Sequence, residues 1–348
     1  MTTEPSKNTN TAGPAPAGEA PLLETRGLTK HFPIGRGFAH KSLLHAVDDA
    51  DLSIGRGEIV ALAGESGSGK STVARLLAGV YRPTGGEIYY QGEPLSRLRS
   101  WRDRQTYRGD VPMVFQDPFS SLNPAYRVSH GIMRGIKLHR PDLRGAAARQ
   151  AEAERVVEAV GLVPAADILG RFPHELSGGQ RQRIGFAQAL AYRPTLILAD
   201  EPVSMLDVSI RIGLLNLMAR LRADEGVSFL YITHDIAGAR YVADRVVIMY
   251  GGHIVESGPT ETVLADPKHP YTRLLLSAVP DPRAPLELGP AGDAGEPPSV
   301  VDPADGCRFR QRCPLAIERC HHETPLTRVL GPDRSAACHV AQPAAVSV

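Results

Sequence analysis

The chain has 348 residues, of which 42% are hydrophobic and 22% are charged, close to ordinary globular usage. Its 39 basic and 38 acidic side chains nearly balance, which argues against a dedicated nucleic-acid-binding protein. No apolar run approaches the roughly 20 residues of a membrane-spanning helix, and residues 1–20 lack the apolar stretch of a secretory signal, so the chain is expected to be cytosolic or peripheral to a membrane.

The N-terminal part predicts a tail followed by a β-rich entry into the first domain. Residues 1–20 carry no Val, Ile, Leu or aromatic side chain, which predicts a disordered tail. Residues 24–54 predict short strands and turns, interrupted by a loop at Gly35–Gly37. The main domain is expected to extend over residues 21–280.

The next stretch predicts a site for phosphate groups. Residues 58–63 form an apolar, strand-length run, and residues 70–79 predict a helix that ends at a glycine. Between them, residues 64–71 read G-E-S-G-S-G-K-S, which fits the phosphate-loop pattern in the strand–loop–helix context that this pattern requires. Backbone N–H groups and the helix N-terminus would face phosphate oxygens, Lys70 would reach the β- and γ-phosphates, and the Ser71 hydroxyl would ligate Mg²⁺. The predicted phosphate-binding residues are Gly64, Glu65, Ser66, Gly67, Ser68, Gly69, Lys70, Ser71 and Thr72.

Further strands and helices alternate along the chain. Additional strands are expected at residues 87–91, 112–115, 195–199, 227–233 and 245–249, with helices at 146–160 and 211–222. This alternation predicts an α/β fold with a mainly parallel sheet.

One of these strands ends in two carboxylates, Asp200 and Glu201. The carboxyl ends of parallel strands face the ligand crevice. Asp200 is therefore placed to hold Mg²⁺, directly or through water, and Glu201 to orient and deprotonate an attacking water.

A second glycine-containing motif indicates which protein family the sequence resembles. Residues 176–180 read L-S-G-G-Q and precede a helix predicted at 184–191. Such glycines at a helix N-terminus offer a second anion site, which makes sense if it completes the nucleotide site of another copy. With the phosphate loop and the Asp-Glu strand, the motif resembles the ATP-binding subunit of ABC transporters over residues 22–280. The resemblance implies a P-loop NTPase fold with an N-terminal antiparallel β part and a helical subdomain at about 117–192.

The same resemblance assigns roles to individual residues. Gln116 resembles the Q-loop glutamine that touches Mg²⁺ and water, and His234 resembles the switch histidine at the γ-phosphate. Phe32 resembles the aromatic residue that stacks on adenine. Residues 204–207 resemble the D-loop, with Met205 where Ala is commoner. The resemblance thus implies Glu201, His234 and Gln116 as catalytic residues, and Ser177, Gly178, Gly179, Gln180 and Asp207 as contacts to the ATP of the opposite chain.

Two segments narrow the resemblance to importers of oligopeptides and dipeptides: residues 114–124 (V-F-Q-D-P-F-S-S-L-N-P) and residues 269–273 (H-P-Y-T-R). This implies an ATPase that pairs with an identical or paralogous ATPase, two permease subunits and an external solute-binding protein at the cytoplasmic face of the membrane. The solute could be a dipeptide, an oligopeptide, nickel or another small molecule. The alternative is a soluble ABC ATPase acting on nucleic acid or ribosomes, which the near-neutral charge and single nucleotide domain disfavour.

All four cysteines lie in the last 42 residues, after a Pro/Gly-rich linker at 281–306. Cys307, Cys313, Cys320 and Cys338 are spaced C-x5-C-x6-C-x17-C. Four thiolates suit either tetrahedral zinc or an iron–sulfur cluster, and four reduced thiols are the third interpretation. The resemblance to oligopeptide/dipeptide importers favours a [4Fe–4S] cluster that orders the tail at 307–348.

Overall fold

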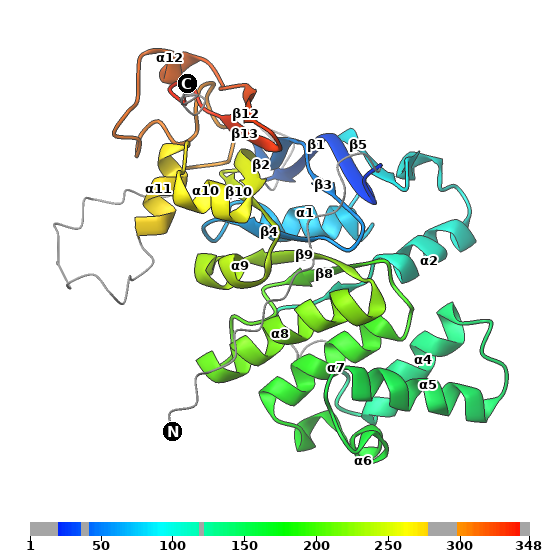
Figure 1. Ribbon diagram of the computed structural model, residues 1–348. Coiled ribbons are helices and arrows are strands. Elements are labelled where there is room, and N and C mark those ends of the chain that lie inside the picture. The colour runs from blue at the N-terminus through cyan, green and yellow to red at the C-terminus, as the bar shows by residue number, and fades with distance from the viewer. Residues whose placement is uncertain (1–19, 36–41, 118–121, 278–297, 342–348) are drawn as a thin grey trace, which may run out of the picture.

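The computed structural model describes residues 20–35, 42–117, 122–277 and 298–341 (Figure 1). The tail predicted at 1–20 lies outside the described residues except for residue 20, and so does most of the linker predicted at 281–306. Within the described ranges, no helix is both long enough and apolar enough to cross a membrane.

An eight-stranded main sheet forms the centre of the molecule, in the order β12-β13-β11-β10-β4-β9-β8-β7. Its five adjacent strands from β10 to β7 run parallel, which confirms the predicted mainly parallel α/β core. These five are β10 (Arg245–Tyr250), β4 (Ile59–Ala63), β9 (Ser228–Thr233), β8 (Leu196–Asp200) and β7 (Met113–Val114). The strand predicted at 112–115 is thus only two residues long.

Both faces of the parallel strands are covered by helices. Along β4, Ile59, Ala61 and Ala63 pack into one core cluster, while Val60 and Leu62 pack into the other. Because every position is buried, the strand is apolar throughout and does not alternate with polar residues. One cluster includes helix α1 (Lys70–Leu77), and the other includes α7 (Gly178–Leu190), α8 (Val208–Glu225) and α9 (Ile236–Val242). Helices α1 and α7 therefore lie on opposite faces of the sheet (Figure 1).

A second, antiparallel sheet is built from the N-terminal part, in the order β2-β1-β5-β6 with β3 against β1. Its strands are β1 (Leu23–Ile34), β2 (Ser42–Ala50), β3 (Ser53–Ile54), β5 (Gly85–Tyr90) and β6 (Glu93–Pro94). The prediction of short strands and turns over residues 24–54 was wrong, since β1 has 12 residues and β2 has nine. Strand β1 stays continuous because it pairs on both edges, and register shifts near residues 28–31 absorb its irregular stretch.

Most of residues 128–190 are helical, and these helices form a group of their own below the main sheet in Figure 1. They are α4 (Val128–His139), α5 (Ala146–Ala159), α6 (Ala165–Gly170), the 3₁₀ turn η2 (Pro173–Glu175) and α7. The other helices in the described ranges are the turn η1 (Leu95–Arg97), α2 (Trp101–Asp110), α10 (Thr260–Ala265), α11 (Pro270–Ser277) and α12 (Arg319–His322).

The C-terminal segment continues the main sheet instead of standing apart from it. Strands β11 (His253–Pro259), β13 (Arg334–Ala337) and β12 (Thr327–Gly331) pair in antiparallel fashion beyond β10. A buried ion pair fastens β13 to β11, with side-chain exposures of 6% for Arg334 and 0% for Glu256. The Glu256 carboxylate accepts a hydrogen bond from Arg334 Nη2 at 3.0 Å and two more from backbone N–H groups.

Replacing Arg334 by alanine should therefore destabilise the chain strongly. Removing one partner of a buried ion pair leaves the other charge without its counter-ion, which costs about 3–5 kcal/mol. We expect a loss of this size in the free energy of unfolding measured by urea denaturation. The matched control is Arg328→Ala on the exposed side of β12, which should change little. Equal unfolding midpoints for the two variants would show that the Arg334–Glu256 ion pair does not stabilise the packing of β13 against β11.

Candidate nucleotide-binding site

The loop between β4 and α1 requires glycine at two positions. Gly64 has φ +153° and Gly69 has φ +104°, both in the region that favours glycine. A Cβ atom at Gly64 would lie 2.1 Å from the carbonyl oxygen of Met249, and one at Gly69 would lie 2.2 Å from that of Ala46. The neighbouring backbones thus approach the loop so closely that any side chain there would displace them.

Lys70, the first residue of α1, is buried inside this loop. Its Nζ donates hydrogen bonds to the carbonyl oxygens of Gly64 and Glu65, both at 2.7 Å. Burial lowers the pKa of Lys70, while the carboxylates of Glu201, Asp200 and Glu65 act in the opposite direction. The two carbonyl acceptors therefore fix the Lys70 amine at the centre of the loop.

Two oxygen ligands of the kind that Mg²⁺ prefers meet where β8 ends beside α1. The Ser71 hydroxyl donates a hydrogen bond to Oδ1 of Asp200 at 3.0 Å. Burial raises the pKa of Asp200, and the hydrogen bond from Ser71 opposes that shift. A buried carboxylate with a hydroxyl beside it, next to a phosphate loop, fits the usual oxygen coordination of Mg²⁺.

The three predicted catalytic side chains, Gln116, Glu201 and His234, meet directly after the end of β8. Glu201 Oε2 accepts a hydrogen bond from Gln116 Nε2 at 3.0 Å and lies 3.3 Å from His234 Nδ1. Gln116 also donates to the hydroxyl of Ser204 at 3.3 Å. Glu201 follows β8 and His234 follows β9, so adjacent parallel strands bring the two side chains together. Their chemical roles stay predictions.

The rest of the predicted ATP-binding set surrounds the loop. Ser66 and Gly67 are exposed, Ser68 is buried and Thr72 is half-buried on α1. Phe32 is half-buried on β1, where its ring meets the Tyr81 ring edge-on at 5.3 Å between centroids. Its contact with adenine stays a prediction.

The L-S-G-G-Q motif forms the start of α7, which corrects the helix predicted at 184–191. Helix α7 begins at Gly178, so Gly178 and Gly179 lie in its first turn. Ser177 is the N-cap: its hydroxyl accepts from the Gln180 N–H at 3.2 Å, and the Gln180 side chain accepts from the Ser177 N–H at 3.0 Å. This reciprocal pair is a capping box, whose S-x-x-Q spacing is present in the sequence and gives the correct helix start.

The motif is separate from the phosphate loop of its own chain. Helix α7 packs on the opposite face of the sheet from α1, and within the described part of the chain no hydrogen bond or ion pair joins residues 177–180 to residues 64–72. Ser177 is exposed, and so is Asp207 at the N-cap of α8. Of the predicted contacts to an opposite chain, Ser177 and Asp207 are therefore accessible, Gly178 and Gln180 are half-buried, and Gly179 is buried.

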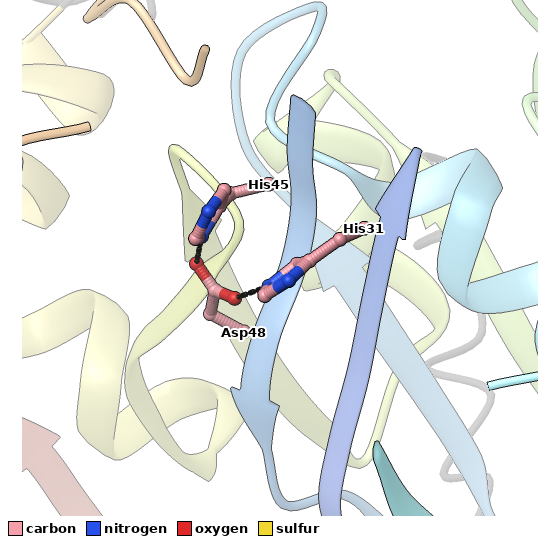
Figure 2. Close-up of side chains that lie close together, drawn as sticks. All are labelled: His31, His45 and Asp48. Carbon is pink, nitrogen blue, oxygen red and sulfur yellow. Dashed lines mark hydrogen bonds and ion pairs between the residues drawn. The ribbon is translucent and has the colours of Figure 1, made fainter. Parts of the chain in front are cut away.

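A cluster that the sequence did not suggest lies on the β1–β2 hairpin (Figure 2). One carboxylate oxygen of Asp48 is hydrogen-bonded to the His31 ring, and the other lies 3.0 Å from His45 Nδ1. Burial alone would raise the pKa of Asp48, but His31, Arg308 and His45 outweigh it and lower that pKa to about 2. In the described ranges this is the only group of three His, Cys, Asp or Glu ligand atoms within 4.8 Å of one another. Arg308 already supplies a cation here, which disfavours a metal ion.

The four cysteines gather in the C-terminal segment. Cys320 and Cys338 are buried, and Cys307 and Cys313 are half-buried. Burial raises the pKa of Cys307 to about 11, and the neighbouring thiols act in the same direction. No three of the four described sulfurs lie within 4.8 Å of one another.

A buried parallel strand, a glycine-rich loop around a lysine and an adjacent acidic strand end define a P-loop nucleotide-hydrolysing protein. The ABC transporter family model matches residues 47–204, and the model of the oligopeptide/dipeptide transporter C-terminal region matches residues 255–320. The chain belongs to the family of ABC transporter ATP-binding proteins, and it is an ATPase.

Individual relatives are similar over nearly their whole length. The "Probable peptide ABC transporter ATP-binding protein" y4tS of Sinorhizobium fredii is 42% identical over 94% of this chain and 92% of its own. The oligopeptide transport ATP-binding protein AppF of Bacillus subtilis is 39% identical over 93% of this chain and 98% of its own. Among solved structures, a dimeric ATP-binding cassette in a post-hydrolysis state with ADP and Pi superposes with a TM-score of 0.61 and 27% identity, covering 69% of this chain and 99% of that one.

Proposed function

We propose that this chain is the ATP-hydrolysing subunit of an importer for peptides or a related small solute. The observation that carries the proposal is that one chain combines a complete phosphate loop with the C-terminal region of oligopeptide/dipeptide transporters at residues 255–320. The peptide-transport relatives from S. fredii and B. subtilis support it over 92% and 98% of their lengths. We assign selection of the solute to an external binding protein and to the membrane subunits.

Binding of the triphosphate rests on charge neutralisation. We assign Lys70 to the β- and γ-phosphates, where its buried ammonium group would exchange the loop carbonyls for phosphate oxygens. Ser71 and Asp200 would hold Mg²⁺, with Gln116 as a further ligand. When bound, Mg²⁺ would supply positive charge to the phosphate oxygens.

Hydrolysis rests on a positioned base. We assign Glu201 to the attacking water, whose proton its carboxylate would accept. Gln116 keeps that carboxylate oriented through its 3.0 Å hydrogen bond. His234 lies 3.3 Å from the same oxygen. We assign it to contact with the γ-phosphate when ATP is bound.

We propose that two such subunits share each ATP. The phosphate loop of one chain would face residues 177–180 of the other, since the two surfaces lie on opposite faces of the sheet within a chain. Large apolar side chains are exposed beside the D-loop, as expected for a surface that a second subunit covers. They are Met205, Val208 and Ile212.

The helical subdomain offers a surface for the membrane subunits. A hollow beside α4 is lined in part by Tyr126, Met133 and Phe172. Helix α7 also contacts the Q-loop, because Gln182 Nε2 donates to the carbonyl oxygen of Phe115 at 3.4 Å. A permease docked in this hollow would therefore affect the nucleotide site through the Q-loop. It would also hold the chain at the cytoplasmic face of the membrane.

We propose a [4Fe–4S] cluster for the four cysteines, with zinc as the alternative. Four thiols in a small segment with little other apolar material form a suitable donor set. Zinc–sulfur bonds of about 2.3 Å would require the sulfurs to lie within about 4 Å of one another. No three of the described sulfurs lie within 4.8 Å of one another, so they are not at the spacing of a zinc site. The choice of the cluster rests on the resemblance to oligopeptide/dipeptide importers.

Anaerobically purified protein should accordingly be brown and contain about four iron and four sulfide ions per chain. Cys313→Ser should bleach the colour and loosen the C-terminal segment while the ATP-binding core stays folded. Colourless protein with one zinc per chain would replace the cluster by zinc. Metal-free protein with four freely titrating thiols would exclude both.

The transport function is tested by purifying the chain with its natural partners. We expect two permease subunits and a solute-binding protein, and ATP hydrolysis that rises when the binding protein carries its solute. Hydrolysis stimulated by nucleic acid, in protein that purifies without permeases, would contradict the proposal and favour the soluble alternative.

A further inference from the structure

The C-terminal segment reaches directly into the phosphate loop. Arg312, between two of the cysteines, forms two parallel hydrogen bonds with the Glu65 carboxylate, from Nη1 at 2.8 Å and from Nη2 at 2.9 Å. The exposed fraction is 8% for the Arg312 side chain and 30% for Glu65. A bidentate arginine–carboxylate pair of this kind fixes the geometry of both groups.

Aromatic side chains hold the arginine in place. Arg312 Nη1 also donates to the Tyr250 hydroxyl at 3.2 Å, and the guanidinium lies 5.8 Å from the centroid of the Phe309 ring. Phe309 is buried against Tyr250 and Tyr271. Tyr271 in turn accepts a hydrogen bond from the backbone N–H of Glu65 at 2.8 Å. The C-terminal segment therefore holds the Glu65 side chain through Arg312, while Tyr271 of α11 holds the Glu65 backbone.

A second arginine of the same segment supports the other side of the loop indirectly, through residues 251 and 252. Arg308 donates to the carbonyl oxygen of Gly251 and pairs with Asp48. The next residue, Gly252, donates its N–H to the carbonyl oxygen of Ser68 in the loop at 3.0 Å. Arg312 thus contacts the phosphate loop directly at Glu65, and Arg308 supports the loop through residues 251 and 252.

Glu65 is an unfavourable residue for its position. A carboxylate in a loop that binds a triphosphate repels the ligand, and it also attracts the Lys70 ammonium that the phosphates need. Pairing with Arg312 cancels that charge and directs the carboxylate toward the C-terminal segment. Without the arginine, the same carboxylate would face the loop uncompensated.

We propose that Arg312 is a positioning residue for ATP: it neutralises Glu65 and fixes the phosphate loop, which makes the C-terminal segment part of the nucleotide site. This inference rests on the assignment of residues 64–72 to the phosphates. Because the effect acts on ATP binding in the ground state and the transition state alike, it belongs to KM more than to kcat.

The test compares steady-state ATP hydrolysis and binding of Mg·ATP in full-length variants. Arg312→Gln should raise KM for ATP by about tenfold with kcat nearly unchanged. Arg312→Lys should recover only part of the loss, because lysine cannot form the two parallel bonds. The double variant Glu65→Gln/Arg312→Gln should return KM toward the parent value, since the repelling carboxylate is gone. The control is Arg328→Gln on exposed β12, which should match the parent.

Two outcomes would overturn the inference: an unchanged KM in Arg312→Gln, or a double variant as weak as Arg312→Gln. If Arg312→Gln fails to fold, the single variant Glu65→Gln tests the inference by itself, because it keeps the arginine. Its KM should fall below that of the parent, because the charge of Arg312 is then no longer neutralised beside the loop. An equal or higher KM would refute the charge account. A parent chain that binds no ATP would instead refute the phosphate-loop assignment, so the two failures are distinguishable.

Discussion

Glu201→Gln should preserve ATP binding and slow hydrolysis by roughly 10²–10⁴-fold, the usual contribution of a general base. Glutamine has nearly the same shape, so the contacts of residue 201 with Gln116 and His234 can persist. It cannot accept a proton from the attacking water. Because binding depends on Lys70 and the loop, the Kd for ATP should stay near the parent value while kcat falls.

The matched control is Glu261→Gln, which removes an exposed carboxylate paired with Arg240 far along the chain from the site. This variant should hydrolyse ATP at the parent rate. A Glu201→Gln enzyme that also keeps the parent rate would show that another group activates the water. A variant that loses ATP binding altogether would move Glu201 from catalysis to ligand binding.

The centre of the fold could be predicted from the sequence because its signals are local. Strand β4 is apolar throughout, α1 begins at the predicted Lys70, and Gly79 follows its end with φ +64°. Helix α5 ends one residue before the predicted position. Helix α8 starts three residues earlier and ends three residues later than predicted, because its ends carry no apolar periodicity to mark them.

The unpredicted features depend on contacts between distant residues. Strand β1 is long because it pairs with strands on both edges, which no local pattern reveals. The pair of Arg312 and Glu65 joins residues 247 positions apart, and no local pattern in the sequence indicates it. The start of α7 is different, since the capping box at Ser177 and Gln180 was a local signal that sequence reasoning overlooked.

Ser177→Arg should abolish hydrolysis by the assembled transporter while leaving ATP binding by the isolated subunit largely intact. The substitution places a long cation at the N-cap of α7, on the surface proposed to meet the ATP of the opposite chain. Loss of the cap alone costs about 1 kcal/mol of helix stability. Ser177→Ala has that same loss without added bulk, so the difference in kcat between the two variants isolates the effect on the shared site.

Mixed dimers of two differently tagged copies decide whether the sites are shared. If each ATP lies between the phosphate loop of one chain and residues 177–180 of the other, pairing a Glu201→Gln chain with a Ser177→Arg chain concentrates both defects in one site. The second site then combines an intact loop with an intact motif, and about half of the parent rate should remain if the sites turn over independently. Placing both substitutions in one chain and pairing it with the parent should damage both sites. If each chain used its own motif, the two arrangements would give the opposite result.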